Sequence, residues 1–201
     1  MSDFELYLSL GLEHITDPEG YDHILFIVAL CAVFTWKDWK RVAGLVTAFT
    51  LGHSVTLALT TLQVIPLNSD LIEFLIPVTI LLTCLYNILV EKTPDDEKFF
   101  TPKTTPMWRR YLIAAGFGLI HGMGFANFLG GLLGGMEDIF FPLLSFNIGL
   151  EVGQLLIVAI SLTLAFVFIK VLKIPFRAWN VAVSALVGLV AIKLIADTWI
   201  F

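Results

Sequence analysis

The sequence contains few charged residues: Asp, Glu, Lys and Arg make up 14% of its 201 residues, whereas hydrophobic residues make up 58%. A soluble domain usually has about 25% charged and about 45–50% apolar residues. This scarcity of charge argues against an ordinary soluble domain and indicates a chain that lies mostly within a lipid bilayer. The 12 Lys and Arg residues form no long basic block, so nucleic acid is not an expected partner.

Cysteine and familiar catalytic motifs are also scarce. Cys31 and Cys84 lie within apolar runs and no CxxC pattern occurs, which favours two buried thiols over a disulfide or a thiolate metal site. The chain has no GxxxxGK[ST] loop for ATP phosphates and no HExxH zinc motif. Residues 1–20 lack the basic region and cleavage site of a signal peptide, and we expect a short interfacial helix there.

Six apolar runs approach the ~20 residues that a membrane-spanning helix needs. They predict an all-α membrane protein, a bundle of six transmembrane helices within a single integral membrane domain, residues 1–201. The expected spans are about Tyr21–Trp36, Val42–Leu62, Leu71–Val90, Tyr111–Leu133, Pro142–Ile169 and Ala178–Trp199. Because the first run is short, we expect the residues before it to enter the membrane or to tilt.

The basic residues alternate from one connection to the next. The first, third and fifth connections contain Lys37, Lys40, Arg41, Lys92, Lys98, Lys103, Arg109, Arg110, Lys170, Lys173 and Arg177. The positive-inside rule places these connections in the cytoplasm. Both termini are then extracytoplasmic, and residues 91–110 form a cytoplasmic loop.

Histidine recurs where charge is costly. His53 and His121 each lie about 11 residues from the cytoplasmic end of a span, which at ~1.5 Å per residue is close to the bilayer midplane. His23 follows Asp22 at the outer mouth of the first span, and His14 precedes this pair. A lone intramembrane histidine often only bonds between helices, but all four histidines lie at or outside the midplane, which favours a shared metal or proton site.

The fifth span adds polar residues on one helix face. Asn147, Glu151 and Gln154 are spaced by four and three residues, and Glu151 lies near the midplane. Imidazole and carboxylate suit nickel, cobalt, zinc or iron(II) better than copper(I). In the fourth span Gly118 and Gly122 form a GxxxG pattern, which predicts close helix packing or space for an ion beside His121.

The segments DHILFIVAL, TAFTLGHSVTLAL, FGLIHGMGFA and FNIGLEVGQL resemble the HupE/UreJ family of bacterial membrane proteins. That family is associated with nickel and cobalt uptake beside hydrogenase and urease systems, so the resemblance implies a multi-pass divalent-metal permease of the bacterial cytoplasmic (inner) membrane. The ligands it implies are Asp22, His23, His53, His121 and Glu151. The family motif has five residues between its first histidine and the Asp-His pair, whereas seven separate His14 from Asp22, so either His14 or Asp17 can complete the set.

The expected function is therefore transport of nickel, cobalt or zinc across the lipid bilayer through a site of His14, Asp22, His23, His53, His121 and Glu151. Asp17, Ser54, Asn147 and Gln154 are expected to line the path or to orient the ligands. The alternative is an intramembrane zinc-dependent hydrolase with a lipid-like substrate, in which histidines, acids and Ser54 surround the zinc. A metal sensor within a larger complex, and a homo-oligomer, also remain open; the permease is favoured over an enzyme, and no catalytic residue is assigned.

Overall fold

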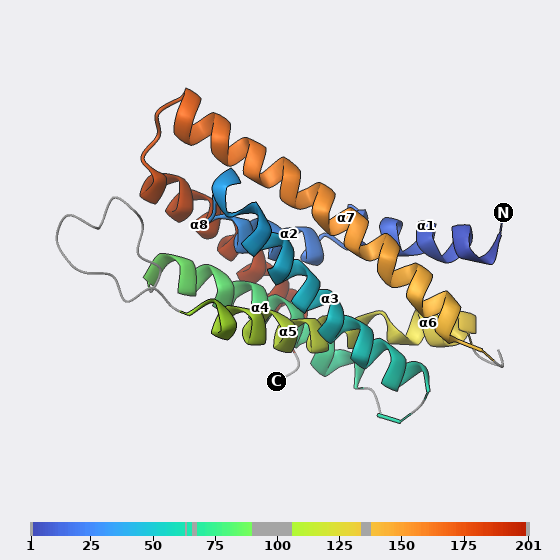
Figure 1. Ribbon diagram of the computed structural model, residues 1–201. Coiled ribbons are helices and arrows are strands. Elements are labelled where there is room, and N and C mark those ends of the chain that lie inside the picture. The colour runs from blue at the N-terminus through green and yellow to red at the C-terminus, as the bar shows by residue number, and fades with distance from the viewer. Residues whose placement is uncertain (1, 63, 66–67, 90–105, 134–137, 200–201) are drawn as a thin grey trace.

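The structure is a computed structural model that describes residues 2–62, 64–65, 68–89, 106–133 and 138–199 (Figure 1). Every regular element within these ranges is a helix, which confirms the all-α prediction. The elements are α1 (Asp3–Thr16), α2 (Asp22–Cys31), the 3-10 turn η1 (Trp36–Asp38), α3 (Trp39–Thr61), α4 (Ser69–Leu89), α5 (Met107–Gly124), α6 (Ala126–Leu133), α7 (Phe140–Phe166), the π-helical segment Val167–Val171 and α8 (Phe176–Asp197).

Four helical segments are long and apolar enough to cross a membrane. They are Trp36–Thr61, Ser69–Leu89, Phe140–Val171 and Phe176–Asp197. Each coincides with an expected span, namely the second, third, fifth and sixth. The chain is therefore a multi-pass membrane protein by the length and composition of its helices.

The first and fourth expected spans are not continuous helices over their whole length. The first contains the ten-residue helix α2, which ends at Cys31 instead of continuing to Trp36. The fourth is divided at Phe125 into α5 and α6. Gly122 and Gly124 immediately precede this break, and glycine lowers helix stability by about 1 kcal/mol relative to alanine, so a break is favoured there.

Helix α1 lies along the first half of α7, and the two helices run in the same direction (Figure 1). A Cβ atom added at Gly11 would collide with the carbonyl oxygen of Phe146, and one added at Gly149 would collide with that of Leu8. The two backbones can approach this closely because both crossing residues are glycine. The expected N-terminal helix is thus present, and it is packed lengthwise against a long apolar helix.

Helices α3 and α5 form a second close pair, which is also parallel (Figure 1). A Cβ atom at Gly52 would collide with the carbonyl oxygen of Ala115, and one at Gly118 would collide with that of Phe49. One at Gly122 would collide with the backbone of His53. The close packing predicted from the GxxxG pattern is confirmed, and it sets His53 and His121 beside the α3–α5 crossing.

The basic helix ends gather on one side of the molecule. The starts of α3, α5 and α8 and the end of α7 all lie toward the left of Figure 1, and they bear the described residues Lys37, Lys40, Arg41, Arg109, Arg110, Lys170, Lys173 and Arg177. We call this side the basic end. Residues 91–105, which make up the rest of the expected cytoplasmic loop 91–110, lie outside the described residues.

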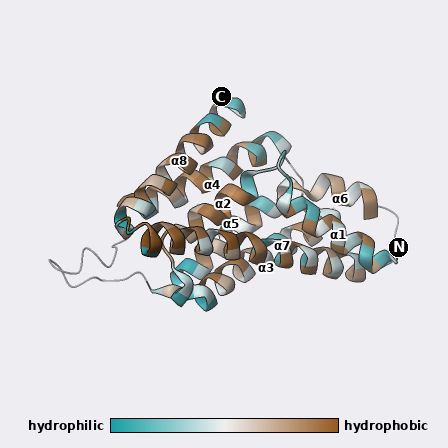
Figure 2. Cartoon of the chain, turned by 90° about the horizontal axis from the view of Figure 1, so that it is seen from above, coloured by the Kyte–Doolittle hydropathy of each residue, from teal (hydrophilic) through white to brown (hydrophobic). Residues whose placement is uncertain are grey.

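The outer faces of the long helices are apolar. Figure 2 shows hydrophobic residues over most of α4, α7 and α8, with hydrophilic residues toward the helix ends and between the helices. Large exposed apolar side chains include Leu82, Val152, Ile160, Leu186 and Leu189. A surface of this kind suits contact with lipid.

Candidate metal centre

All four histidines of the chain converge in the interior. They come from four helices: His14 from α1, His23 from α2, His53 from α3 and His121 from α5. The ring centroids of His14 and His23 are 4.7 Å apart, and those of His23 and His121 are 5.0 Å apart. The His53 ring lies 5.9 Å from each of His14 and His23.

Two overlapping sets of donor atoms result. One atom each from His14, His23 and His53 lie within 4.8 Å of one another, and the same holds for Asp22, His23 and His121. Nitrogen ligands lie about 2.0–2.1 Å from a zinc ion, so two ligand atoms of a tetrahedral site are about 3.4 Å apart. Small side-chain adjustments would therefore suffice for either set to bind a transition-metal ion. We call these five residues the histidine cluster.

Asp22 determines which nitrogen of His23 is free. Nδ1 of His23 lies 2.9 Å from Oδ1 of Asp22. An ionised carboxylate only accepts hydrogen bonds, so Nδ1 carries the proton and Nε2 keeps its lone pair. This Nε2 is buried and has no hydrogen-bond partner among the described residues. A carboxylate behind a histidine is a common arrangement at metal sites, because it orients the ring and raises its basicity.

Thr79 of α4 determines which nitrogen of His121 is free. The Thr79 hydroxyl lies 2.7 Å from the carbonyl oxygen of Ile76 and 2.9 Å from Nε2 of His121. Its single hydrogen is given to that carbonyl, so Thr79 accepts a hydrogen bond from Nε2–H of His121. Nδ1 of His121 then keeps its lone pair, and it is buried without a partner within the described part of the chain.

Sequence reasoning missed Thr79. A threonine within a helix commonly bonds to its own backbone, and nothing in the sequence tells which threonine also meets a distant histidine. The one available signal was the four-residue spacing of Thr79, Thr83 and Asn87 in the expected third span, which puts these polar residues on one face of that helix.

His53 and His14 leave further buried nitrogens free. The His53 side chain is 0% exposed, and neither of its ring nitrogens has a partner in the described ranges. Nε2 of His14 is likewise buried and has no hydrogen-bond partner among the described residues. Buried polar atoms in proteins are nearly always hydrogen-bonded, and leaving one unpaired costs about 1–3 kcal/mol. Five unpaired nitrogens in one cluster are best explained by a ligand.

Aromatic rings enclose the cluster. The Phe125 ring centroid lies 3.9 Å from that of His14, Phe49 lies 5.1 Å from His121 and Phe146 lies 6.5 Å from His53. Phe26, Phe49 and Phe146 are almost completely buried. Such a wall lowers the local dielectric constant, which strengthens the attraction between a cation and Asp22.

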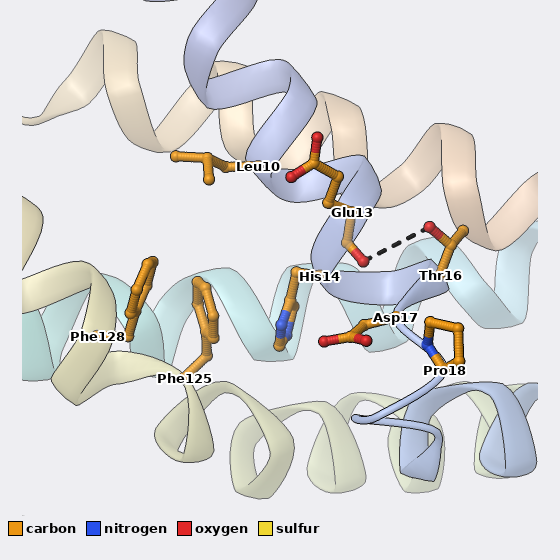
Figure 3. A pocket seen from close by; sticks show the side chains of 8 residues that line it. All are labelled: Leu10, Glu13, His14, Thr16, Asp17, Pro18, Phe125 and Phe128. Carbon is orange, nitrogen blue, oxygen red and sulfur yellow. Dashed lines mark hydrogen bonds between the residues drawn. The ribbon is translucent and has the colours of Figure 1, made fainter.

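Two cavities reach the cluster. One of about 530 Å³ is lined by Leu10, Glu13, His14, Thr16, Asp17, Pro18, Phe125 and Phe128. Figure 3 shows His14 between Phe125 and Asp17 on its wall. The other, of about 190 Å³, contains Glu19, Asp22 and Glu73 in its lining. Both approaches are acidic, so both would attract a cation.

The remaining predicted residues lie outside both donor sets. The Glu151 carboxylate accepts hydrogen bonds from the hydroxyls of Thr47 (2.6 Å) and Thr50 (2.7 Å). Ser54 donates to the backbone carbonyl of Thr50, at 2.7 Å. Asn147 donates to the carbonyl of Leu143, at 2.8 Å. Asp17 lines the larger cavity and accepts a hydrogen bond from the backbone of Glu19, and Gln154 lies 2.9 Å from the Thr50 hydroxyl.

A family model described as HupE / UreJ protein matches residues 1–201, the whole chain. Neither the search of curated proteins nor that of solved structures gave a match.

Proposed function

We propose that this chain, which belongs to the HupE/UreJ family, is a permease for a divalent transition metal of the nickel and cobalt class. The ion would bind His14, Asp22, His23, His53 and His121 as it crosses the membrane. The observation that carries the proposal is the set of buried ring nitrogens without partners in the described part of the protein, which belong to four helices and face a common interior.

The ligand types support this class of ion. Imidazole nitrogen suits nickel, cobalt and zinc, and one carboxylate offsets part of the double positive charge. The two free cysteines, Cys31 and Cys84, belong to neither donor set, so the thiolate ligands that copper(I) prefers are missing from the described cluster. Which of nickel, cobalt and zinc is carried is to be settled by competition between the three ions.

The acidic cavities are the proposed entrance. Glu13 and Asp17 would concentrate cations in the larger cavity, where His14 is the first ring nitrogen that an ion meets. His23 is common to both donor sets, so an ion could pass from the His14 side to the His121 side without leaving it. Transfer between overlapping sites keeps binding weak enough for the ion to move on.

The membrane potential would favour inward movement of the ion. A charge crossing 100 mV gains about 2.3 kcal/mol, so a divalent ion gains about 4.6 kcal/mol. We place the basic end in the cytoplasm by the positive-inside rule, so that the acidic cavities face outward. The permease then takes up metal from outside with no need for an ATP-binding motif, and the sequence contains none.

The test combines metal content with uptake. Purified protein is loaded with Ni²⁺ and analysed for bound metal, and right-side-out and inverted vesicles are assayed for ⁶³Ni²⁺ uptake under an inside-negative potential. His53→Ala and His121→Ala are expected to lower both bound metal and uptake by about 10-fold or more. Thr60→Val is the control, because Thr60 is a buried α3 residue whose hydroxyl bonds to its own helix.

Three outcomes would contradict the proposal. Unchanged metal content and uptake in both histidine variants would exclude the cluster as the site. Uptake only by inverted vesicles would reverse the orientation. Stoichiometric metal that stays bound while uptake is nil would favour the zinc-dependent hydrolase instead, because a hydrolase retains its metal.

A further inference from the structure

A second cluster of polar side chains lies at the interface between α3 and α7. Oε1 of Glu151 is 2.6 Å from the Thr47 hydroxyl, and Oε2 is 2.7 Å from the Thr50 hydroxyl. The Thr50 hydroxyl is also 2.9 Å from Oε1 of Gln154. We call Thr47, Thr50, Glu151 and Gln154 the seam site.

The seam site is nearer the basic end than the histidine cluster. On α3, Thr50 and Thr47 precede His53 by three and six residues, which is about 4.5 and 9 Å along the helix axis. On α7, Glu151 and Gln154 follow Phe146, whose ring faces both His14 and His53. Both helices therefore place these polar residues between the cluster and the ends that bear Arg41 and Lys170.

The carboxylate of Glu151 lacks a positive partner in the described structure. The ion pairs found there are His23–Asp22 and Arg41–Asp38, and the recorded partners of Glu151 are the two hydroxyls. Neighbouring positions on both helices are apolar, among them Leu51, Ile148, Val152 and Leu155, whose side chains are exposed. An ionised carboxylate in such a setting costs several kcal/mol unless a cation accompanies it.

The hydroxyls of Thr47 and Thr50 can stop donating to the Glu151 carboxylate and donate to a backbone carbonyl instead. Thr47 also lies 3.0 Å from the carbonyl oxygen of Ala43, and Thr50 lies 3.1 Å from that of Val46. If each hydroxyl turned its hydrogen to this carbonyl, its lone pairs would face the space beside Glu151. Hydroxyl and carboxylate oxygens would then be free together to bind a cation.

The side-chain amide of Gln154 has one buried atom without a hydrogen-bond partner in the described structure. Its side chain is 0% exposed, and its Nε2 has no partner among the described residues. Rotation of the amide by 180° would let Nε2 donate to the Thr50 hydroxyl. The free atom would then be a buried carbonyl oxygen, which is a further cation ligand.

We propose that the seam site is a second, weaker station for the transported divalent metal, which it receives from the histidine cluster. This inference rests on the proposed function. All its ligands are oxygen atoms, which bind nickel and cobalt less strongly than imidazole does. An ion that leaves the histidine cluster toward the basic end would therefore bind next at the seam site. There Glu151 compensates part of its charge, and the weaker ligands allow it to dissociate.

The experiment measures Ni²⁺ binding by calorimetry and ⁶³Ni²⁺ uptake by vesicles. The wild-type protein is expected to show one tight and one weaker binding event. Glu151→Gln, which keeps the shape of the side chain, should retain the tight event, lose the weaker one and lower uptake about 10-fold. Thr47→Val should weaken the second event, whereas Thr163→Val, at an α7 threonine that bonds to Ala159 of its own helix, should leave both events unchanged.

The tight event reports on folding and on the histidine cluster, so the two proposals fail separately. Wild-type protein without any uptake would overturn the proposed function. Glu151→Gln protein with both binding events intact would overturn the seam site, even if uptake falls, because Glu151 would then carry a proton or serve another step. Loss of the tight event in Glu151→Gln would also overturn it, because Glu151 would then belong to the cluster.

Discussion

At the scale of single residues, the decisive property is which ring nitrogen carries a proton. Asp22 fixes the proton of His23 on Nδ1, and Thr79 fixes that of His121 on Nε2. The lone pairs that remain face the interior without partners in the described ranges. Asp22 and Thr79 thus each leave one ring nitrogen of a histidine free to bind a metal ion.

This tautomer argument makes Thr79 a positioning residue. Thr79→Val removes the acceptor for Nε2–H of His121, so the ring loses its fixed orientation. We expect Ni²⁺ affinity to fall about 10- to 100-fold, as is usual when a partner behind a metal ligand is removed. Thr79→Ser keeps the hydroxyl and should bind nearly as tightly as the wild type, and calorimetric titration measures both. Equal affinity of the valine and wild-type proteins would show that Thr79 has no part in the site.

The histidines could be predicted from the sequence, whereas Thr79 and the place of Glu151 could not. Histidine is rare and costly within a membrane, so four of them at similar depths are informative. Threonine satisfies its hydroxyl on its own helix, and only the packing of α4 against α5 gives Thr79 its second partner. The depth of Glu151 was expected to match that of the histidines, but α7 turns its carboxylate toward Thr47 and Thr50.

At the scale of helices, close backbone contacts determine where the ligands lie. Gly11 and Gly149 let α1 pack on α7, and Gly52 and Gly118 let α3 pack on α5. Each crossing lies within one helical turn of a histidine of the cluster, namely His14, His53 or His121. The break between α5 and α6 was not predicted, because Gly122, which allows close packing against His53, also weakens the helix just before Phe125.

The α3–α5 crossing yields a matched pair of substitutions on one helix. A Cβ atom at Gly118 would collide with the backbone of Phe49, whereas one at Gly116 would meet nothing within 4 Å. Gly118→Ala should lower the free energy of unfolding by about 1–3 kcal/mol and weaken Ni²⁺ binding, because His53 and His121 move apart. Gly116→Ala should leave binding unchanged. Thermal unfolding in detergent together with metal titration measures both, and equal behaviour of the two variants would contradict the packing argument.

At the scale of the whole molecule, charge is divided between two ends. The basic end contains all the described Lys and Arg residues except Lys193, and both cavities at the cluster are acidic. The sequence alone predicted this division, because the hydropathy and the position of each charge are local properties. It could not predict that α1 packs lengthwise on α7, since that depends on two glycines 138 positions apart, Gly11 and Gly149.

The central claim is that imidazoles of the histidine cluster bind the transported metal ion, and X-ray absorption spectroscopy of the Ni²⁺-loaded protein tests it most directly. We predict a nickel ion bound by nitrogen and oxygen, with the multiple-scattering signature of at least two imidazoles, which diminishes in His53→Ala and His121→Ala. Nickel surrounded by oxygen alone, with no imidazole signature in the wild-type protein, would contradict the account.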